Sequence, residues 1–288
     1  MRQQRGPRSA PPPKQRIALP PALSRELKTL GCPICGKGFY PKGSGLNCRR
    51  EHSFDISATG YLNLAPGQAV PAHYDAASFA SRRRFLQAGY YDHLFEAVAP
   101  YAQGLCVDIG CGDGWWAARL AGMGRRMIAL DNSREAIRLA SRGQPQVCWL
   151  VADLARLPLR DQRADCLLNL FAPANYAEFE RVLKPGGLLV KLAPGPDHLR
   201  ELRQAAGGLI GDSGHETGRV AKHFDQRFGL QERRLVSQTL PLDAEALENL
   251  IAMTPLHFGL DTAVIDRAAI RQVTIEAELL VGRRADQG

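Results

Sequence analysis

An apolar run that leads directly into three closely spaced glycines constrains the fold of this chain most. Residues 105–109 are predicted to form a buried strand, and Gly110, Gly112 and Gly114 follow it in alternate positions. Glycine adopts positive φ at little cost and lets a ligand approach the main chain where a β-carbon would collide. A helix is predicted at 117–121. The pattern therefore predicts a strand, a ligand-binding loop and a helix, as in the nucleotide-cofactor sites of open α/β sheets.

The spacing of these glycines distinguishes two classes of cofactor. A dinucleotide fingerprint has its third glycine three residues after the second, but that position is Trp115 here and the glycine comes one residue earlier. The pattern Asp108-x-Gly110-x-Gly112-x-Gly114 instead resembles the first motif of class I methyltransferases, whose methyl donor is S-adenosylmethionine. A structural turn without a ligand is the competing interpretation.

Acidic residues follow the next two predicted strands. Strand 126–130 ends at Asp131, where an acid can accept hydrogen bonds from ribose hydroxyls, although NAD enzymes place an acid there too. Strand 146–151 is followed by Asp153, which lies where methyltransferases usually have an acid near the adenine amine, or which only caps the strand end. Because the carboxyl ends of parallel strands meet at one edge, we expect the glycine loop and both acids around one cavity.

The remainder of the chain alternates between strand and helix, which predicts a mostly parallel sheet with helices on both faces. We expect a strand at 165–171, a helix at 176–183, a strand at 188–193, a helix at 197–206 and a final strand at 273–281. The alternating pattern of the final strand predicts an antiparallel edge strand with one exposed face.

One connection stands out by its glycine content. Residues 207–218 hold five glycines, which predicts either a mobile loop over the site or a plain surface connection.

Three cysteines and a histidine near the N-terminus have the spacing of a metal site. Cys32, Cys35, Cys48 and His52 give Cys-x2-Cys-x12-Cys-x3-His, with glycine-rich turns between. Four such ligands complete a tetrahedral zinc site and leave no position for a substrate, so the predicted zinc ion is structural. Disulfides are the alternative, and so is a three-cysteine site without His52. The other four cysteines lie in or beside apolar strands and need no functional explanation.

Positive charge is concentrated at the N-terminus. Residues 1–50 carry a net charge of +10, whereas the whole chain carries +8, so the remainder has a net charge of −2. An acidic polymer is the expected partner, and charge alone does not distinguish RNA from DNA.

Residues 1–24 hold six prolines and no acid, which predicts a disordered basic arm, with an organelle transit peptide as the alternative. Residues 82–84 are three arginines that either extend the basic surface or form a solvated helix face.

Size and composition fit one enzyme domain with a smaller appended module. The chain has 288 residues, of which 45% are hydrophobic and 23% charged. It has no run of about 18 apolar residues and no secretory signal pattern, so we expect no membrane span and a cytoplasmic location.

The ordered combination of these motifs resembles one known family. The sequence Cys32-Pro-Ile-Cys35 continues through Cys48-x3-His52-Ser-Phe-Asp, Gly60-Tyr-Leu-Asn-Leu, Arg83-Arg-Phe-Leu-x2-Gly-Tyr-Tyr91 and the glycine loop. Over about residues 30–284 the chain resembles the ribosomal RNA large-subunit methyltransferase A family, which methylates N1 of a guanine in a 23S rRNA hairpin. Residues 65–78 differ from the family pattern, and the proline-rich arm is additional.

The resemblance implies a class I methyltransferase fold of the α/β class, with a Rossmann-like, mostly parallel sheet and a small N-terminal zinc-binding module. The expected organisation is a disordered arm at 1–24, a zinc-binding RNA-recognition module at 25–66, a linker and helix at 67–95, and the methyltransferase domain at 96–288. The resemblance also implies a homodimer and 23S rRNA as partner. The expected cofactor contacts are Tyr91, Asp108, Gly110, Gly112, Gly114, Trp116, Ala117, Asp131, Asp153 and His198.

The chemistry requires alignment of guanine N1 with the donor methyl group and removal of the N1 proton. Phe171 is expected to stack on the base and Asn175 to hydrogen-bond its edge. The sequence singles out no base, and Asp113, Asp153, Asp165 and His198 all remain open. Two other functions also remain open: a methyltransferase for a small molecule, and an RNA-binding protein with a vestigial cofactor site.

Overall fold

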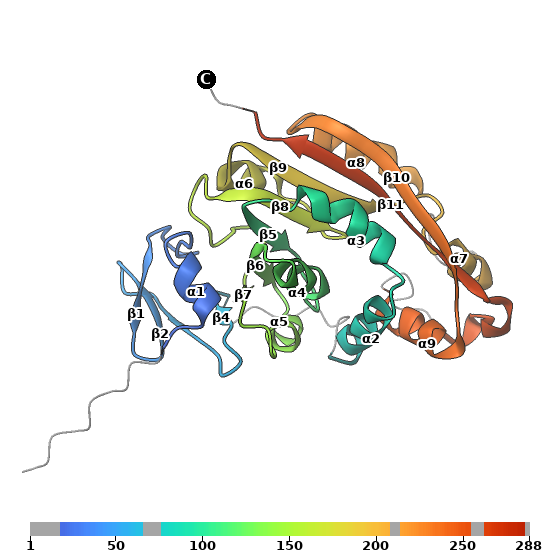
Figure 1. Cartoon of the computed structure of the whole chain (residues 1–288), viewed down its shortest axis with the longest axis horizontal. Helices are drawn as coiled ribbons and strands as arrows, with labels where there is room; N and C mark the ends of the chain where they lie inside the picture. Colours follow the sequence, from blue (N-terminus) through green and yellow to red (C-terminus); the bar gives the residue numbers. More distant parts are fainter. Residues whose placement is uncertain (1–17, 66–75, 208–213, 255–261, 286–288) are drawn as a thin grey trace, which may run out of the picture.

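A central sheet of eight strands organises the part of the chain that the structure describes. The computed structural model describes residues 18–65, 76–207, 214–254 and 262–285. The strand order is β10-β11-β9-β8-β5-β6-β7-β4 (Figure 1). These strands are β4 (Leu62–Asn63), β5 (Leu105–Ile109), β6 (Arg126–Asp131), β7 (Val147–Val151), β8 (Ala164–Leu170), β9 (Leu183–Pro194), β10 (Gly229–Pro241) and β11 (Gln272–Arg283).

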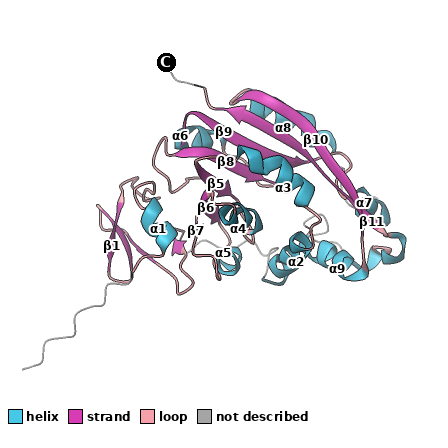
Figure 2. Cartoon of the chain, viewed as in Figure 1, coloured by secondary structure: helices cyan, strands magenta, loops and turns pink. Residues whose placement is uncertain are grey.

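Strands β4 to β9 are mutually parallel wherever they pair, and β11 is antiparallel to both β9 and β10. Helices cover both faces of the sheet (Figure 2). Side chains of α2–α5, α7 and α9 join one hydrophobic core, and side chains of α1, α6 and α8 join the other. The helices are α1 (Pro21–Glu26), α2 (Ala76–Gln87), α3 (Asp92–Val98), α4 (Trp115–Gly122), α5 (Arg134–Ala140), α6 (Tyr176–Val182), α7 (Arg200–Ala205), α8 (Gly214–Asp225) and α9 (Ala244–Met253).

Side-chain alternation along the central strands explains the two cores. In β5, Val107 and Ile109 face one core and Cys106 faces the other, and all three are fully buried. Successive side chains of a strand point to opposite faces, so a continuous apolar run is what a strand covered on both sides requires. This confirms the prediction of a parallel sheet covered by helices on both faces.

The final strand corrects one prediction. Strand β11 is antiparallel, as expected, but it lies inside the sheet between β9 and β10 and is buried on both faces. Its acidic residues have partners within the protein: Glu276 accepts a hydrogen bond from the Asp197 amide at 2.8 Å, and Glu278 pairs through Oε1 with Arg233 at 2.6 Å. The alternation therefore reflects buried polar partners and not an exposed face.

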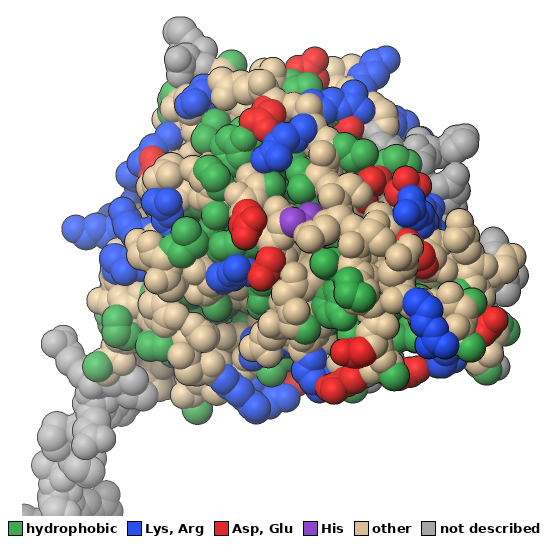
Figure 3. Space-filling view, turned by 45° about the vertical axis from the view of Figure 1, so that its right-hand side comes forward, with side chains coloured by type: hydrophobic (Ala, Val, Ile, Leu, Met, Phe, Trp, Pro, Cys, Tyr) green, Lys and Arg blue, Asp and Glu red, His purple; other side chains and the backbone are tan. Residues whose placement is uncertain are grey.

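The strand that covers β11 was not expected. Strand β10 forms the edge of the sheet and is mostly exposed, with Leu235 53% exposed. The polar sequence of β10 does not show the apolar pattern by which a strand is predicted, because an edge strand needs little apolar burial. The face that Figure 3 brings forward shows basic and acidic side chains interspersed with hydrophobic ones. This agrees with the balanced charge of the chain after residue 50.

The N-terminal module is a small three-stranded sheet with one helix. Strands β1 (Phe39–Lys42), β2 (Gly45–Cys48) and β3 (Ser53–Asp55) pair antiparallel in that order, in keeping with the glycine-rich turns of this segment. Helix α1 begins inside the stretch 1–24 that was predicted to be a disordered arm, and Ala22 and Leu23 are buried. The arm prediction is therefore wrong for residues 18–24, and residues 1–17 lie outside the described part.

The module joins the central sheet through main-chain hydrogen bonds. Strand β4 pairs parallel with β7, and the Leu64 amide donates to the Val151 carbonyl at 2.9 Å. Glu26, fully buried, pairs with Arg126 of β6 at 2.9 Å. Residues of the module and the sheet share one hydrophobic core. The two parts are consequently one packed body.

Two boundaries also differ from the expectation. Helix α3 runs across the boundary drawn at residue 95. Helix α8 begins at Gly214, so the last part of the predicted loop at 207–218 is helical, and residues 208–213 lie outside the described part. Among the helices of the described residues, none combines the length and the apolar character needed to cross a membrane, as expected.

We expect Leu23→Ala to destabilise the whole protein. Leu23 is 2% exposed, and truncation of a buried leucine costs about 2 to 5 kcal/mol. The measurement is chemical denaturation followed by circular dichroism. Ser24→Ala, at an exposed position of the same helix, is the matched control and should change stability by less than about 0.5 kcal/mol. Equal stability of the two variants would mean that α1 does not pack on the sheet.

Candidate functional site

The glycine loop after β5 has the backbone geometry that its sequence predicts. Gly110, Gly112 and Gly114 have φ of 73°, 54° and 78°, and the Gly110 amide donates to the Leu130 carbonyl at 2.9 Å. A β-carbon on Gly110 would lie 2.7 Å from the Ala172 β-carbon. The loop after β5 and the loop after β8 therefore approach each other as closely as only glycine permits.

A cavity of about 400 Å³ opens between these two loops. This volume falls within the range of about 300 to 1,000 Å³ that small-molecule sites occupy. Its wall brings together four of the predicted cofactor residues with residues of α2 and of the loops after β6, β7 and β8. The lining residues are Phe79, Arg82, Gly110, Gly112, Asp131, Asn132, Ser133, Asp153, Leu154, Leu170, Phe171, Ala172 and Pro173.

Asp131 is held in position by the main chain. Its Oδ2 accepts from the Gly112 amide at 2.9 Å and its Oδ1 from the Ser133 amide at 2.8 Å. Burial raises the pKa of Asp131, and these two amides act in the opposite direction. Each carboxylate oxygen has a further lone pair, so the carboxylate can still accept hydrogen bonds from two neighbouring hydroxyls.

Asp108 lies beneath the loop as a buried acid. It is 1% exposed, and its Oδ2 has no hydrogen-bond partner among the described residues. Burial, with the nearby Asp131 carboxylate, raises the pKa of Asp108 to about 7. A buried acceptor without a partner costs free energy, which a positively charged ligand group beside it would recover.

Helix α2 covers this site through its arginines. Arg82 pairs with the fully buried carboxylate of Asp113 at 3.3 Å, and Arg83 pairs with the same group at 3.6 Å. Arg84 instead donates to Asn249 of α9 at 2.9 Å. Arg82 and Arg83 are partly buried and pair with an internal acid, so they form neither a basic track nor a solvated face, whereas Arg84 is exposed as the solvated-face interpretation expects.

Several predicted cofactor residues lie behind the cavity wall. Gly114 begins α4, and a β-carbon there would lie 2.5 Å from the Trp149 ring, so this glycine is needed for packing. The side chains of Trp116 and Ala117 are buried in the core, while the first turn of α4 has no side-chain cap.

Tyr91 and His198 are also buried behind the wall. Tyr91 packs edge-on against both Phe171 and His198, and His198 stacks on Phe171 with ring centroids 5.6 Å apart. His198 Nδ1 accepts from the Glu276 amide at 3.2 Å, and burial lowers the pKa of His198 to about 4. His198 is therefore a neutral support for Phe171, which itself adopts φ of 56°.

Two predicted roles are wrong. Asn175 caps α6, accepting from the Glu178 amide at 3.4 Å and donating to the Leu154 carbonyl at 3.1 Å, so its side chain does not present a free edge to a base. Asp165 lies at the start of β8, at the opposite end of the sheet, where it accepts from the Leu105 amide at 2.8 Å and pairs with Lys184 at 2.6 Å. Asp165 is therefore excluded as the base.

The structure adds Lys191, which the sequence reasoning missed. It lies in β9 and is 6% exposed, beside Asn169 of β8. The available signal was one cation in the apolar run Leu188-Leu-Val-Lys-Leu-Ala193. A strand covered on both faces rarely holds a charged residue without a specific partner or function.

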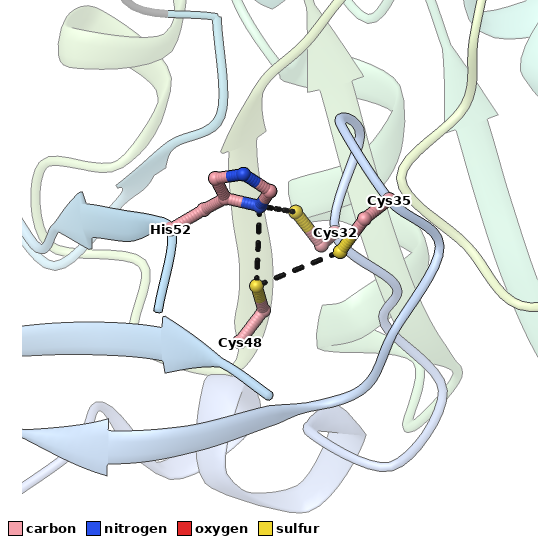
Figure 4. Close-up of side chains that lie close together, drawn as sticks. All are labelled: Cys32, Cys35, Cys48 and His52. Atoms are coloured by element: carbon pink, nitrogen blue, oxygen red, sulfur yellow. Dashed lines mark hydrogen bonds between the residues drawn. The ribbon is translucent and has the colours of Figure 1, made fainter. Parts of the chain in front are cut away.

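The metal-ligating residues converge as predicted (Figure 4). His52 Nδ1 lies 3.5 Å from the Cys32 sulfur and 3.3 Å from the Cys48 sulfur, and the Cys35 and Cys48 sulfurs are 3.6 Å apart. All four ligand atoms lie within 4.8 Å of one another. Tetrahedral zinc with bonds of about 2.3 Å to sulfur separates its sulfur ligands by about 3.8 Å, so these residues fit one zinc ion.

Comparison with protein families divides the chain in the same way. Residues 106–187 match a family described as a methyltransferase domain, and residues 30–70 match the zinc ribbon described as "RlmA, N-terminal". The methyltransferase domain implies S-adenosylmethionine as cofactor, and the ribbon implies a structural zinc ion.

Relatives extend over nearly the whole chain. The 23S rRNA (guanine(748)-N(1))-methyltransferase of Streptomyces fradiae is 33% identical, over 89% of this chain and 97% of its own length. The putative 23S rRNA (guanine-N(1)-)-methyltransferase YxjB of Bacillus subtilis is 32% identical, over 88% and 96%. The chain belongs to the 23S rRNA guanine-N1 methyltransferase family.

Other relatives of this methyltransferase share less of the chain. A malonyl-[acyl-carrier protein] O-methyltransferase of Erwinia pyrifoliae is 31% identical over 72% of the chain and 84% of its own length. Two solved structures have a TM-score of 0.50. One is a putative methyltransferase of Anabaena variabilis, 14% identical over 66% of this chain and 96% of its own. The other is the Haloferax volcanii complex of the Trm112 activator with a putative methyltransferase, 20% identical over 76% and 100%. Both support the class I methyltransferase fold.

We expect Gly110→Ala to weaken binding of S-adenosylhomocysteine by about tenfold or more, because the new methyl group meets Ala172. Gly124→Ala is the matched control: Gly124 has φ of 81°, and nothing lies within 4 Å of the position that its new methyl group would take. The control therefore shares the backbone strain without the collision. Isothermal titration calorimetry measures both affinities. Unchanged affinity in Gly110→Ala would place the cofactor elsewhere.

Proposed function

We propose that this enzyme transfers the methyl group of S-adenosylmethionine to N1 of a guanine in a hairpin of 23S rRNA. S-adenosylmethionine supplies a methyl group made electrophilic by the adjacent sulfonium. The protein must then hold the acceptor nitrogen in line with that group and receive a proton from it.

The observation that carries the proposal is the zinc ribbon packed onto the methyltransferase sheet. Relatives named as 23S rRNA methyltransferases match about nine-tenths of the chain, at 89% and 88%, whereas the Erwinia O-methyltransferase matches 72%. The match of residues 30–70 to the zinc ribbon described as "RlmA, N-terminal" is what favours an RNA acceptor over a small one.

For the cofactor, we propose direct contacts from the four predicted residues that line the 400 Å³ cavity. Gly110 and Gly112 leave room for the ligand, Asp131 accepts from the ribose hydroxyls, and Asp153 lies near the adenine. Asp108 supplies negative charge beneath the methionine part. Tyr91 and His198 act through Phe171, and Gly114, Trp116 and Ala117 shape the loop and the first turn of α4.

For the RNA, we propose that the ribbon contributes a phosphate-binding surface. Lys37 and Arg49 of the ribbon and Arg160, between β7 and β8, line a cavity of about 310 Å³ together with two glycines. Phosphate contacts by such cations supply much of the affinity for nucleic acid. We call these three residues the ribbon cation cluster. Two further proposals rest on the family resemblance, a homodimer and a cytoplasmic location.

The purified enzyme should convert a guanine of 23S rRNA to N1-methylguanosine. Nucleoside mass spectrometry after digestion identifies the product, and primer extension locates it, because a methyl group at N1 blocks base pairing. Malonyl-acyl carrier protein, offered to the enzyme in a parallel reaction, should not be methylated. Methyl transfer to the acyl carrier protein, with none to rRNA, would overturn the proposed function.

Arg160→Glu should weaken binding of the rRNA hairpin by about tenfold without changing affinity for S-adenosylhomocysteine, because it reverses one charge of the ribbon cation cluster. Fluorescence anisotropy at several salt concentrations measures the change, and the salt dependence should also decrease. Arg234→Glu on the edge strand β10 makes the same charge change far from the ribbon and serves as control. If both variants bind alike, the ribbon cation cluster does not contact RNA.

A further inference from the structure

A second cavity lies on the other side of one wall of the cofactor cavity. It has a volume of about 610 Å³ and is formed by the loop after β8, the end of β9 and helix α8. Phe171, Ala172 and Pro173 line both cavities. Because the two cavities share these three residues, a methyl donor in the first cavity and an acceptor in the second would lie next to each other.

The second cavity has the side chains that a nucleobase requires. Phe171 and Tyr176 offer aromatic surface, Arg219 of α8 offers positive charge, and His223 of α8 offers a polar ring. Bases taken out of a stacked RNA are held by aromatic stacking, and phosphates are held by cations. Unstacking the base costs a few kcal/mol, which such contacts can offset.

Lys191 is the buried group in the wall of this cavity. Its Nζ donates to Asn169 Oδ1 at 2.6 Å and to the Ala172 carbonyl at 3.2 Å. Asn169 is itself fixed, because its Nδ2 donates to the Pro173 carbonyl at 2.9 Å. The amine is therefore tied to the same three-residue wall that separates the two cavities.

The surroundings of Lys191 make its neutral form easier to reach than that of an exposed lysine. No carboxylate pairs with Lys191 in the described part of the chain, and burial lowers its pKa to about 8. The charged and titratable groups that line the cavity with it are Arg219, His223 and Tyr176, and none of these is an acid. A neutral amine has two hydrogens and one lone pair. Asn169 and Ala172 accept the two hydrogens, so the lone pair remains.

We propose that the second cavity holds the flipped target guanine and that the Lys191 amine is the base that removes its N1 proton. This rests on the proposed function. The N1–H bond breaks and the proton goes to Lys191 Nζ, which becomes an ammonium. The electron pair left on N1 forms the bond to the methyl carbon, while the carbon–sulfur bond of the donor breaks and its electrons stay on sulfur. The ammonium then loses its proton to water.

Two substitutions separate proton removal from positive charge. Lys191→Arg keeps the positive charge but cannot accept a proton, and Lys191→Gln has neither a positive charge nor a basic nitrogen. Both should lower the single-turnover rate by about 100-fold or more and remove the rise of rate with pH that has its midpoint near pH 8 in the wild type. Lys184→Gln, at an exposed position near the start of the same strand, should leave rate and pH profile unchanged.

The outcomes are distinct. If Lys191→Arg keeps the wild-type rate within about threefold, or if either variant keeps the midpoint near pH 8, Lys191 is not the base. If the variants do not fold, the wild type carries the test, because a rate independent of pH between about 7 and 9 would equally overturn the assignment. A wild-type enzyme that leaves 23S rRNA unmethylated would instead contradict the proposed function.

The base site has a test that does not depend on turnover. A 23S rRNA hairpin with 2-aminopurine in place of the target guanine should gain fluorescence on binding the protein without cofactor, because the base leaves its stack. Ala174→Trp, which fills the second cavity from a position outside the cofactor cavity, should abolish the gain and keep affinity for S-adenosylhomocysteine. Ala269→Trp, exposed and outside both cavities, is the control. A full fluorescence gain in Ala174→Trp would place the flipped base elsewhere.

Discussion

The parallel pairing of β5 with β8 is the constraint on which the site depends. Val107 and Leu167 are aligned across this pair, so the two strands end side by side and deliver the glycine loop and the Phe171 loop to one edge of the sheet. Gly110 then approaches Ala172 so closely that no side chain fits between them. The methyl donor and the acceptor can meet there because main chain, and not flexible side chains, sets the distance between the two loops.

The zinc ribbon is also joined to the central sheet by parallel strand pairing. Strand β4 extends the sheet beyond β7, and the buried Glu26 pairs with Arg126, so the metal-bound module cannot rotate freely on the catalytic domain. RNA held by the ribbon would therefore be presented to the cavities in a fixed orientation. Such preorganisation reduces the entropy lost on binding and improves positioning at once.

Sequence patterns were sufficient wherever one local rule decided the structure. Apolar runs predicted the central strands, glycine spacing predicted the loop of positive φ after β5, and cysteine spacing predicted the convergence of the four metal-ligating residues. They failed where the partner is distant in the chain. Leu23 is buried by a sheet more than 100 residues further on, which no local pattern in a proline-rich segment reveals. Likewise, Glu276 and Glu278 of β11 look like an exposed face until their partners from other elements are known.

The site residues also differ in whether a local sequence pattern or a distant partner decides where they lie. Gly110, Gly112, Asp131 and Asp153 line the cavity because their position at strand ends fixes where they lie. The roles expected of Asn175 and Asp165 failed because the hydrogen-bond partners of a side chain depend on the tertiary fold. The Lys191 amine donates hydrogen bonds to Asn169 and Ala172, and only the pairing of β8 with β9 brings these residues beside it.

The two cavities differ in the charged side chains that line them. Asp131 and Asp153 line the cofactor cavity together with Arg82, which pairs with the buried Asp113, whereas the described lining of the second cavity holds Lys191, Arg219 and His223 and no acid. The acids of the first cavity would favour the proposed cationic donor, and Arg219 of the second would favour an anionic nucleotide. The same separation keeps the acids away from Lys191, and a nearby carboxylate would stabilise its ammonium form and remove the free lone pair. The absence of acids from the described lining of the second cavity is thus in keeping with both proposals, a nucleotide in that cavity and Lys191 as the base.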